Sequence, residues 1–516
     1  MDRASARTLA CLLALICRAT EAKDLLEVFQ DAVHSDPQIR QADATRRASR
    51  EQKPQALAAL LPQVNGTASV VHDHQSYLED TPYPVTNPNT GATSFLLFPY
   101  QETQNVTQQQ WALNLRQNVF SWTNWMTLKE ASSEVAQAEA TYQAAEQNLI
   151  QRLSQAYFNV LSAVDGLDAQ QASLEAISRQ LDQADKRYEV GLIPITDVEE
   201  AKASRDTAAA AVIAAKRTLA TAEDQLEEIT GQKYDSLSKP GANMPLSMPS
   251  PASQDRWVEI SMEQNLTLIA SRLAADIARD KVHVAFGGHL PTVDIVASRT
   301  FQGSLGDETL TGVNAPLNGV RSNYGDKQIS LQVTVPIFSG GLTQSQVRQA
   351  QYQWIAAKEA VVQSSRATER QARDAYLGVI SGIAHVQALG QALESRQTAL
   401  KATEAGYEVG TRTAVDLLNA RQALVQAQTD YSTARYDYIN SMIMLRLAAG
   451  NLDQAQLAQI NSWLNTRAPT TPSASPTPES LTPPPGTPVP QVPINPQTVR
   501  PPEGTPQPAG RDPRGR

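Results

Sequence analysis

The chain has 516 residues and a formal net charge of −9 at pH 7. An acidic balance of this kind argues against a nucleic-acid partner. Only two residues are cysteines, Cys11 and Cys17, and about half of the 31 prolines follow Arg467. No run of about 20 apolar residues follows the first 22 positions, so the sequence predicts no transmembrane helix.

The segment 1–22 has the pattern of a secretory signal peptide. Two arginines precede a short apolar run at 9–16, and Ala22 stands where a signal peptidase requires a small residue. We expect cleavage after Ala22, so that the mature chain begins at Lys23. Both cysteines leave with this segment, which leaves no disulfide and no cysteine-based metal site. Neither cysteine follows a small residue at the end of the apolar run, so a lipid anchor is not expected.

The rest of the chain contains one pattern twice. The run Tyr188–Gly191 recurs as Tyr407–Gly410 about 219 residues later, and at the same offset Asp197 matches Asp416. Several further matches follow in the same order, which indicates a tandem duplication rather than a solenoid of short repeats.

The duplication predicts five segments after the signal peptide. These are a first repeat at 23–231, a linker at 232–253, a second repeat at 254–449, an equatorial C-terminal segment at 450–466 and a disordered Pro-rich tail at 467–516. We expect the linker and the segment at 450–466 to wrap the middle of the helical part.

Each repeat predicts the same elements in the same order. A helix of about 25–35 residues ends near Pro62 or Pro291, and two strands follow, joined by a long polar loop at about 77–105 or 302–327. A very long helix comes next, from about 123 to 189 in the first repeat, and a turn leads to a second long helix. At 1.5 Å per residue the long helix measures roughly 100 Å, so it must lean on neighbouring helices.

One stripe of that helix shows how it packs. Leucine or valine recurs every seven residues, at Leu153, Val160, Leu167, Leu174 and Leu181. This spacing is the seam of a coiled coil. Taken alone, the stripe is equally consistent with a fibrous, periplasmic coiled-coil structural protein.

The strands favour a membrane barrel instead. Apolar and polar residues alternate strictly in 329–335, largely in 111–116, and again in 64–70 and 293–298. This pattern fits a barrel with lipid outside and water inside, or a half-buried soluble sheet. Four strands cannot close a barrel, because about eight are needed, and lipid does not tolerate open sheet edges. A membrane location therefore requires several chains to share one barrel.

Several motifs carry a family resemblance. They lie along the first long helix, at the turns of both long hairpins and where the second pair of strands begins, at 156–161, 179–183, 190–192, 195–198, 288–292 and 406–413. Their order and spacing resemble the TolC family of outer-membrane efflux and type I secretion channels, over roughly 24–449.

The resemblance implies a mainly α-helical protein with a small β part. Three chains would form a 12-stranded β-barrel in the outer membrane, with four strands from each chain, continuous with an α-helical barrel that crosses the periplasm. It implies a passive exit channel, opened by a membrane-fusion adaptor and an inner-membrane transporter of the RND, ABC or MFS type. The cargo (drugs, peptides or proteins) is not encoded in any motif.

The resemblance also implies a gate at the periplasmic end of the tunnel. Tyr407 and Arg412 would bond to Thr196 and Asp197 and tie the helices shut, and Asp416 would face the lumen. Charge-assisted bonds at helix ends form and break at a cost of a few kcal/mol. Without the resemblance, solvated helix-end groups would be the simpler interpretation.

The two Val-Gly turns mark the closed end. Glycine at Gly191 and Gly410 suits a helix C-terminus where the chain reverses through positive φ. The resemblance implies that these turns also border the grooves in which the adaptor docks.

One position departs from the family pattern. The pattern has a second aspartate three residues after Asp416, where this chain has Asn419. A ring of three carboxylates selects cations and binds multivalent blockers. With one ring in place of two, we expect weaker cation selectivity and weaker block.

The sequence predicts no enzyme, cofactor or metal site. There is no phosphate-binding glycine loop and no nucleophile elbow. His72 and His74 lie on one face of a predicted strand, which most often means a solvated pair. A third possibility, an adaptor-type protein, does not fit the duplication or the barrel strands.

Overall fold

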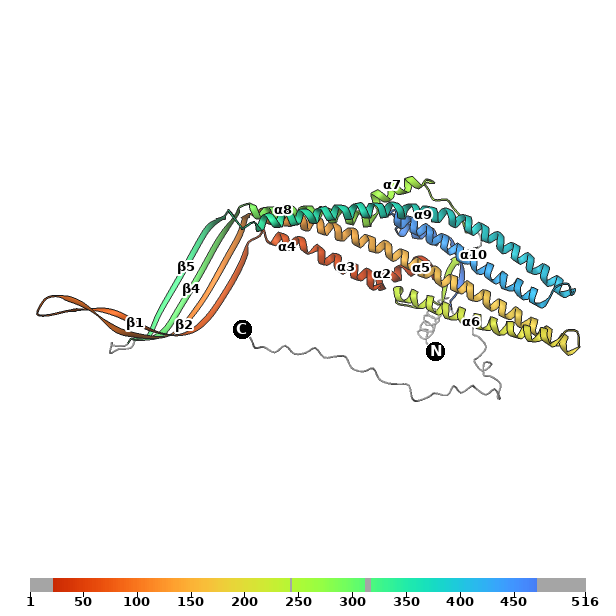
Figure 1. The fold of residues 1–516 in the computed structure, drawn as a ribbon, viewed down its shortest axis with the longest axis horizontal. Helices are drawn as coiled ribbons and strands as arrows, with labels where there is room; N and C mark the ends of the chain where they lie inside the picture. The colour runs from red at the N-terminus through yellow and green to blue at the C-terminus, as the bar shows by residue number, and fades with distance from the viewer. Residues whose placement is uncertain (1–21, 242–243, 311–316, 471–516) are drawn as a thin grey trace, which may run out of the picture. The chain divides into compact units, whose positions relative to one another are not determined.

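The computed structural model describes residues 22–241, 244–310 and 317–470. Most of the expected signal peptide and of the Pro-rich tail lies outside these residues. The first repeat consists of α2 (Leu25–Ser35), α3 (Pro37–Arg50), α4 (Gln52–Ala58), β1 (Gln63–Thr86), β2 (Thr93–Phe120), α5 (Trp122–Glu189) and α6 (Ile195–Thr230). The second consists of α7 (Gln254–Gln264), α8 (Leu266–Phe286), η1 (Gly287–His289), β4 (Thr292–Leu310), β5 (Leu317–Thr334), α9 (Leu342–Glu408) and α10 (Ala414–Ala448). Figure 1 shows both sets.

The first helix of each repeat is broken, where the sequence predicted one continuous helix. Asp36 has extended backbone and accepts hydrogen bonds from the amides of Gln38 and Ile39, and Pro37 starts α3. Asn265 caps α8 in the same way, and it lies at the matching position of the second repeat. The break between α3 and α4 precedes Pro54, which has no amide hydrogen for the Arg50 carbonyl.

The four long strands form one antiparallel sheet in the order β1-β2-β4-β5. The prediction of long polar loops between the paired strands is largely wrong. β1 and β2 stay paired from Gln63 and Arg116 out to Thr86 and Thr93, so only a short turn joins them. Polar residues that alternate regularly can form cross-strand pairs as apolar residues do. The polar composition of these segments therefore led us to end the strands too early.

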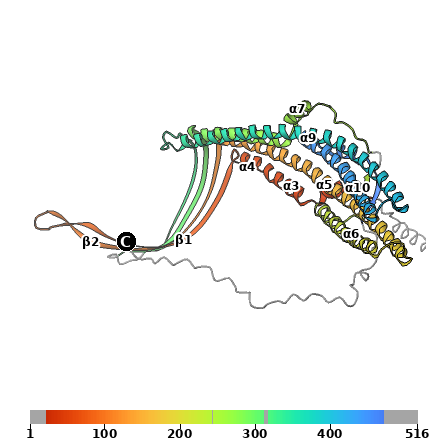
Figure 2. The same cartoon turned by 45° about the vertical axis from the view of Figure 1, so that its right-hand side comes forward.

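Two helical hairpins follow the sheet. α5 packs against α6 and α9 against α10, and α10 also packs against α5 (Figure 2). The predicted seam is confirmed: Leu153, Val160 and Leu167 are buried, and Leu174 and Leu181 are half-buried against the cores. Of the described helices, none is long and apolar enough to cross a membrane.

A second, small sheet lies against the helices. β3 (Ser236–Pro240) pairs antiparallel with β6 (Leu464–Pro469), and α11 (Gln454–Asn461) precedes β6. β6 thus runs three residues past the boundary at 466 that we expected, because Ala468 is buried and the strand stays paired.

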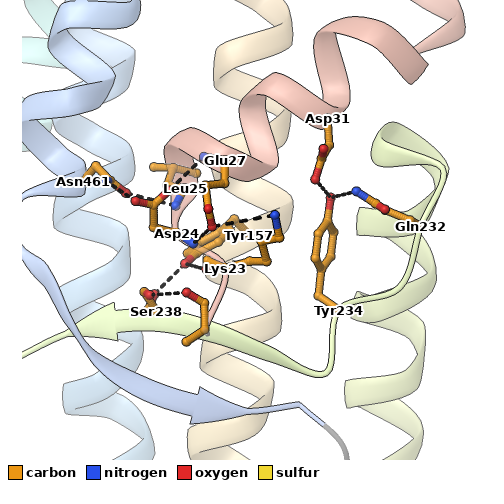
Figure 3. A network of polar contacts seen from close by, with 11 residues as sticks. Lys23, Asp24, Leu25, Glu27, Asp31, Tyr157, Gln232, Tyr234, Ser238 and Asn461 are labelled. Carbon is orange, nitrogen blue, oxygen red and sulfur yellow. Dashed lines mark hydrogen bonds and ion pairs between the residues drawn. The ribbon is translucent and has the colours of Figure 1, made fainter. Parts of the chain in front are cut away.

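The segment that begins at Lys23 is tied to this sheet (Figure 3). The amide of Ser238 donates to the Lys23 carbonyl at 3.0 Å, and Lys23 forms a parallel bridge with β3. The buried Tyr157 hydroxyl lies 3.2 Å from the Lys23 carbonyl and 2.6 Å from the Ser238 carbonyl. Asn461 of α11 donates to Asp24, which caps α2. We name this group of contacts the N-terminal clamp.

Candidate functional site: the turns of the two long hairpins

Both long helices end in the same backbone motif. Gly191 and Gly410 have φ of 74° and 78°, a conformation that suits glycine. In each turn the glycine amide donates to a tyrosine carbonyl three residues back, that of Tyr188 or Tyr407. The next amide donates five residues back, which completes a Schellman motif. The sequence-predicted cap role of both glycines is therefore confirmed by their φ and hydrogen bonds.

The helices that follow the turns begin differently. α10 has a capping box, in which Thr413 Oγ1 accepts from the Asp416 amide at 3.1 Å. The Asp416 carboxylate in return accepts from the Thr413 amide at 3.0 Å and from its hydroxyl at 2.9 Å. These bonds, with Arg412 nearby, lower the pKa of Asp416. α6 begins after Pro194, which makes no side-chain cap.

Arg412 packs on the helix end before it. A Cβ built on Gly406 would lie 2.7 Å from Arg412 Cγ, so the glycine makes room for this side chain. The Arg412 amide also donates to the Gly406 carbonyl at 3.2 Å. In the first repeat, Arg187 stands at the position of Gly406 and Ile193 at the position of Arg412. Ile193 packs on a small apolar core instead.

Tyr407 makes the contact between the two turns. The guanidinium carbon of Arg187 lies 5.5 Å from the centroid of the Tyr407 ring. This geometry is a cation–π contact between the end of α5 and the end of α9. Arg187 was not among the predicted gate residues, although one signal pointed to it: an arginine stands here at the position that matches Gly406 of the second repeat.

The bonds expected across the gate do not form within one chain. Among the described residues, no hydrogen bond or ion pair joins Thr196 or Asp197 to Tyr407 or Arg412. Thr196 instead donates to Asp197 at 3.4 Å.

A further ion pair holds the second hairpin together above the turn. Arg421 of α10 lies 3.2 Å from Glu404 of α9, and the Arg421 side chain is only 18% exposed. Asn419, between this pair and the capping box, is exposed on α10.

Comparison with known proteins agrees with this geometry. The family model described as "Outer membrane efflux protein" matches residues 28–232 and 257–451. The chain belongs to the outer membrane efflux protein family. It is 34% identical to the outer membrane protein TolC of Escherichia coli strain K12 over 465 residues, which is 89% of each chain. It is also 27% identical to the alkaline protease secretion protein AprF of Pseudomonas aeruginosa, covering 84% of this chain and 86% of the relative.

Solved structures show the same fold. The outer membrane channel CmeC of Campylobacter jejuni superimposes with a TM-score of 0.63 at 19% identity, covering 86% of this chain and 90% of that one. The outer membrane protein VceC of Vibrio cholerae gives 0.62 at 19% identity, covering 83% and 96%. The predicted fold, mainly helical with a small β part, is therefore confirmed. This member of the efflux protein family is an outer-membrane exit channel for efflux and type I secretion, with its helical part in the periplasm.

Proposed function

We propose that three copies of the chain form one passive conduit. The observation that supports this is the order of the sheet, which leaves β1 and β5 as its outer strands. Their edges cannot face lipid, and four strands cannot close on themselves. Three chains supply twelve strands and two long helical hairpins each, which is enough for a barrel continuous with a helical tunnel.

The two turns form the periplasmic gate in this proposal. Thr196 and Asp197 stand at the start of α6, and Tyr407 and Arg412 stand on either side of the turn between α9 and α10. The contact between Arg187 and Tyr407 supports a closed arrangement in which the two hairpins touch at their tips. The bonds from Tyr407 and Arg412 to the Thr-Asp pair then form between neighbouring chains or on full closure.

The selectivity ring is the Asp416 carboxylate. Its low pKa keeps it ionised, and Asn419 adds no second charge. One acidic ring attracts cations more weakly than two, so we infer weak block by multivalent cations.

Energy and cargo selection come from partners. A periplasmic adaptor docks beside the turns at Gly191 and Gly410, and an inner-membrane transporter of the RND, ABC or MFS type drives the cargo. The repeats at 23–231 and 254–449 make the conduit, while the segments at 232–253 and 450–466 form a belt around its middle. The names of AprF and of the proteases secretion protein PrtF support protein export as one use.

An unheated gel of outer-membrane fractions tests the assembly. We expect a heat-modifiable band at the mass of three chains in the outer-membrane fraction, and pores when the same material is added to planar bilayers. A soluble monomer from the periplasmic fraction would overturn the proposal.

A further inference from the structure

One face of the four-stranded sheet is largely apolar. Trp111 of β2 and Phe301 of β4 are register partners on this face, and their rings stack with centroids 6.1 Å apart. Exposed apolar side chains continue the face toward the helices, at Val64, Leu113, Ile295, Ile329, Leu331 and Val333. In the proposed barrel this face meets lipid, because apolar residues face outward and aromatic residues lie at the interface.

Two cations interrupt this apolar face. Arg299 of β4 and Lys327 of β5 are direct register partners, so their side chains lie side by side. The Arg299 guanidinium carbon lies 5.7 Å from the centroid of the Trp111 ring, which confirms that the arginine shares the face of the aromatic pair. Both side chains are exposed. Like charges placed directly opposite each other destabilise a sheet unless an anion lies between them.

The described part of the chain supplies no such anion. Of the ion pairs in the described part of the chain, none includes Arg299 or Lys327. The opposite face of the sheet differs, because Arg116 there pairs with Asp294 at 2.8 Å and Asn118 donates to the same carboxylate at 3.0 Å. The Arg116 charge on the polar face is thus matched by Asp294, whereas the two cations on the apolar face have no ion-pair partner among the described residues.

The position of the cation pair along the strands gives its depth. Six residues separate Ile295 from Phe301, which at about 3.3 Å per residue is roughly 20 Å along the strand. A tilted strand therefore uses most of an apolar band about 25 Å tall over this stretch. Arg299 and Lys327 lie one row nearer the helices than the aromatic pair, close to the outer edge of that band. Long basic side chains at this depth extend to the headgroups.

We propose that Arg299, Lys327 and Trp111 form a binding site for a phosphorylated headgroup of an outer-leaflet lipid. Arginine offers two parallel donors to phosphate and lysine offers a point charge, while the Trp111 ring supports the guanidinium. The phosphate relieves the repulsion between the two cations. The site would hold the part of β4 and β5 that carries Arg299 and Lys327 to specific lipid molecules.

Native mass spectrometry of the full-length assembly in detergent tests this site. Three probes are titrated: bis-phosphorylated lipid A, the same lipid with its phosphates removed, and inorganic phosphate. We expect wild type to bind the phosphorylated lipid roughly 25-fold more tightly than the dephosphorylated one, since each of the two basic residues contributes about a fivefold preference for a nearby lipid phosphate. The double variant Arg299→Gln/Lys327→Gln should lose this preference.

Lys358→Gln is the matched control, because Lys358 also lies over a tryptophan ring, that of Trp354, but on α9 outside the sheet. It should bind as wild type does. The proposal fails if the double variant keeps the preference, if the dephosphorylated lipid binds wild type equally well, or if inorganic phosphate alone shows the full affinity. Because the site rests on the proposed barrel, assembly of each variant is scored separately on an unheated gel.

Discussion

The contact between Arg187 and Tyr407 makes a quantitative prediction for gating. Replacing Arg187 by glutamine keeps a polar but shorter side chain and removes the charge, whose guanidinium carbon lies 5.5 Å from the centroid of the Tyr407 ring. An exposed cation–π contact contributes about 0.5–1 kcal/mol. If three such contacts open together, their loss amounts to about 1.5–3 kcal/mol, which shifts the equilibrium toward the open state roughly 10- to 150-fold.

Single-channel recording in planar bilayers measures this shift as the fraction of time spent at high conductance. Tyr407→Phe keeps the ring, so we expect it to change this contact little and to report on the hydroxyl alone. Arg179→Gln is a matched control, because Arg179 lies on the same helix and pairs only locally with Glu175. An Arg187→Gln channel that closes as wild type does, beside a Tyr407→Phe channel that opens, would show that the hydroxyl and not the ring holds the gate.

Three further outcomes follow from the structure. Asn419→Asp should add a second acidic ring and strengthen block by a trivalent cation, and unchanged block would refute the one-ring interpretation. The bonds from Thr413 lower the pKa of Asp416, so the stability they give is complete above the pKa of an unfolded aspartate, about 3.9, and is lost as the pH falls through the lowered value. Cation selectivity at pH 5 should therefore equal that at pH 7, and a loss by pH 5 would contradict the lowered pKa. Tyr157→Phe removes the donor to two carbonyls in the N-terminal clamp and should cost about 1–3 kcal/mol in the free energy of unfolding, whereas Tyr352→Phe at an exposed site should leave the thermal unfolding midpoint unchanged.

Long-range periodicity made most of the fold predictable. The repeated Tyr-Glu-Val-Gly motif indicated the duplication, the expected start of the long helix at about 123 lies within one residue of the start of α5, and the seven-residue spacing from Leu153 identified its packing seam. The missed features depend on local chemistry that periodicity does not contain. The extended backbone of Asp36 and Asn265 ends one helix, and their side chains cap the start of the next; an Asp-Pro pair is a stop signal that a longer apolar pattern concealed.

The candidate site was predictable only in part. Thr413 and Asp416 have the spacing of a capping box, which sequence can reveal, yet the resemblance directed attention to the lumen instead. The partner of Tyr407 could not be read from the sequence, because Arg187 is 220 positions away and the contact exists only when two hairpin tips meet. In the proposed trimer the expected bonds to Thr196 and Asp197 form between chains, so a single chain does not contain them.

The N-terminal clamp sets the order in which the chain can finish folding. Lys23 and Asp24 lie at the beginning of the described chain, yet their partners include Ser238 and Asn461, which follow roughly half-way along it and nearly at its end. The beginning of the chain can therefore pair with β3 only after about half of the chain has been exported, and with Asn461 only near the end. During that wait Leu25 and Val28, which end up fully buried, have no finished core to enter. Periplasmic chaperones that shield this short apolar segment should matter more for yield than those acting on the long helices.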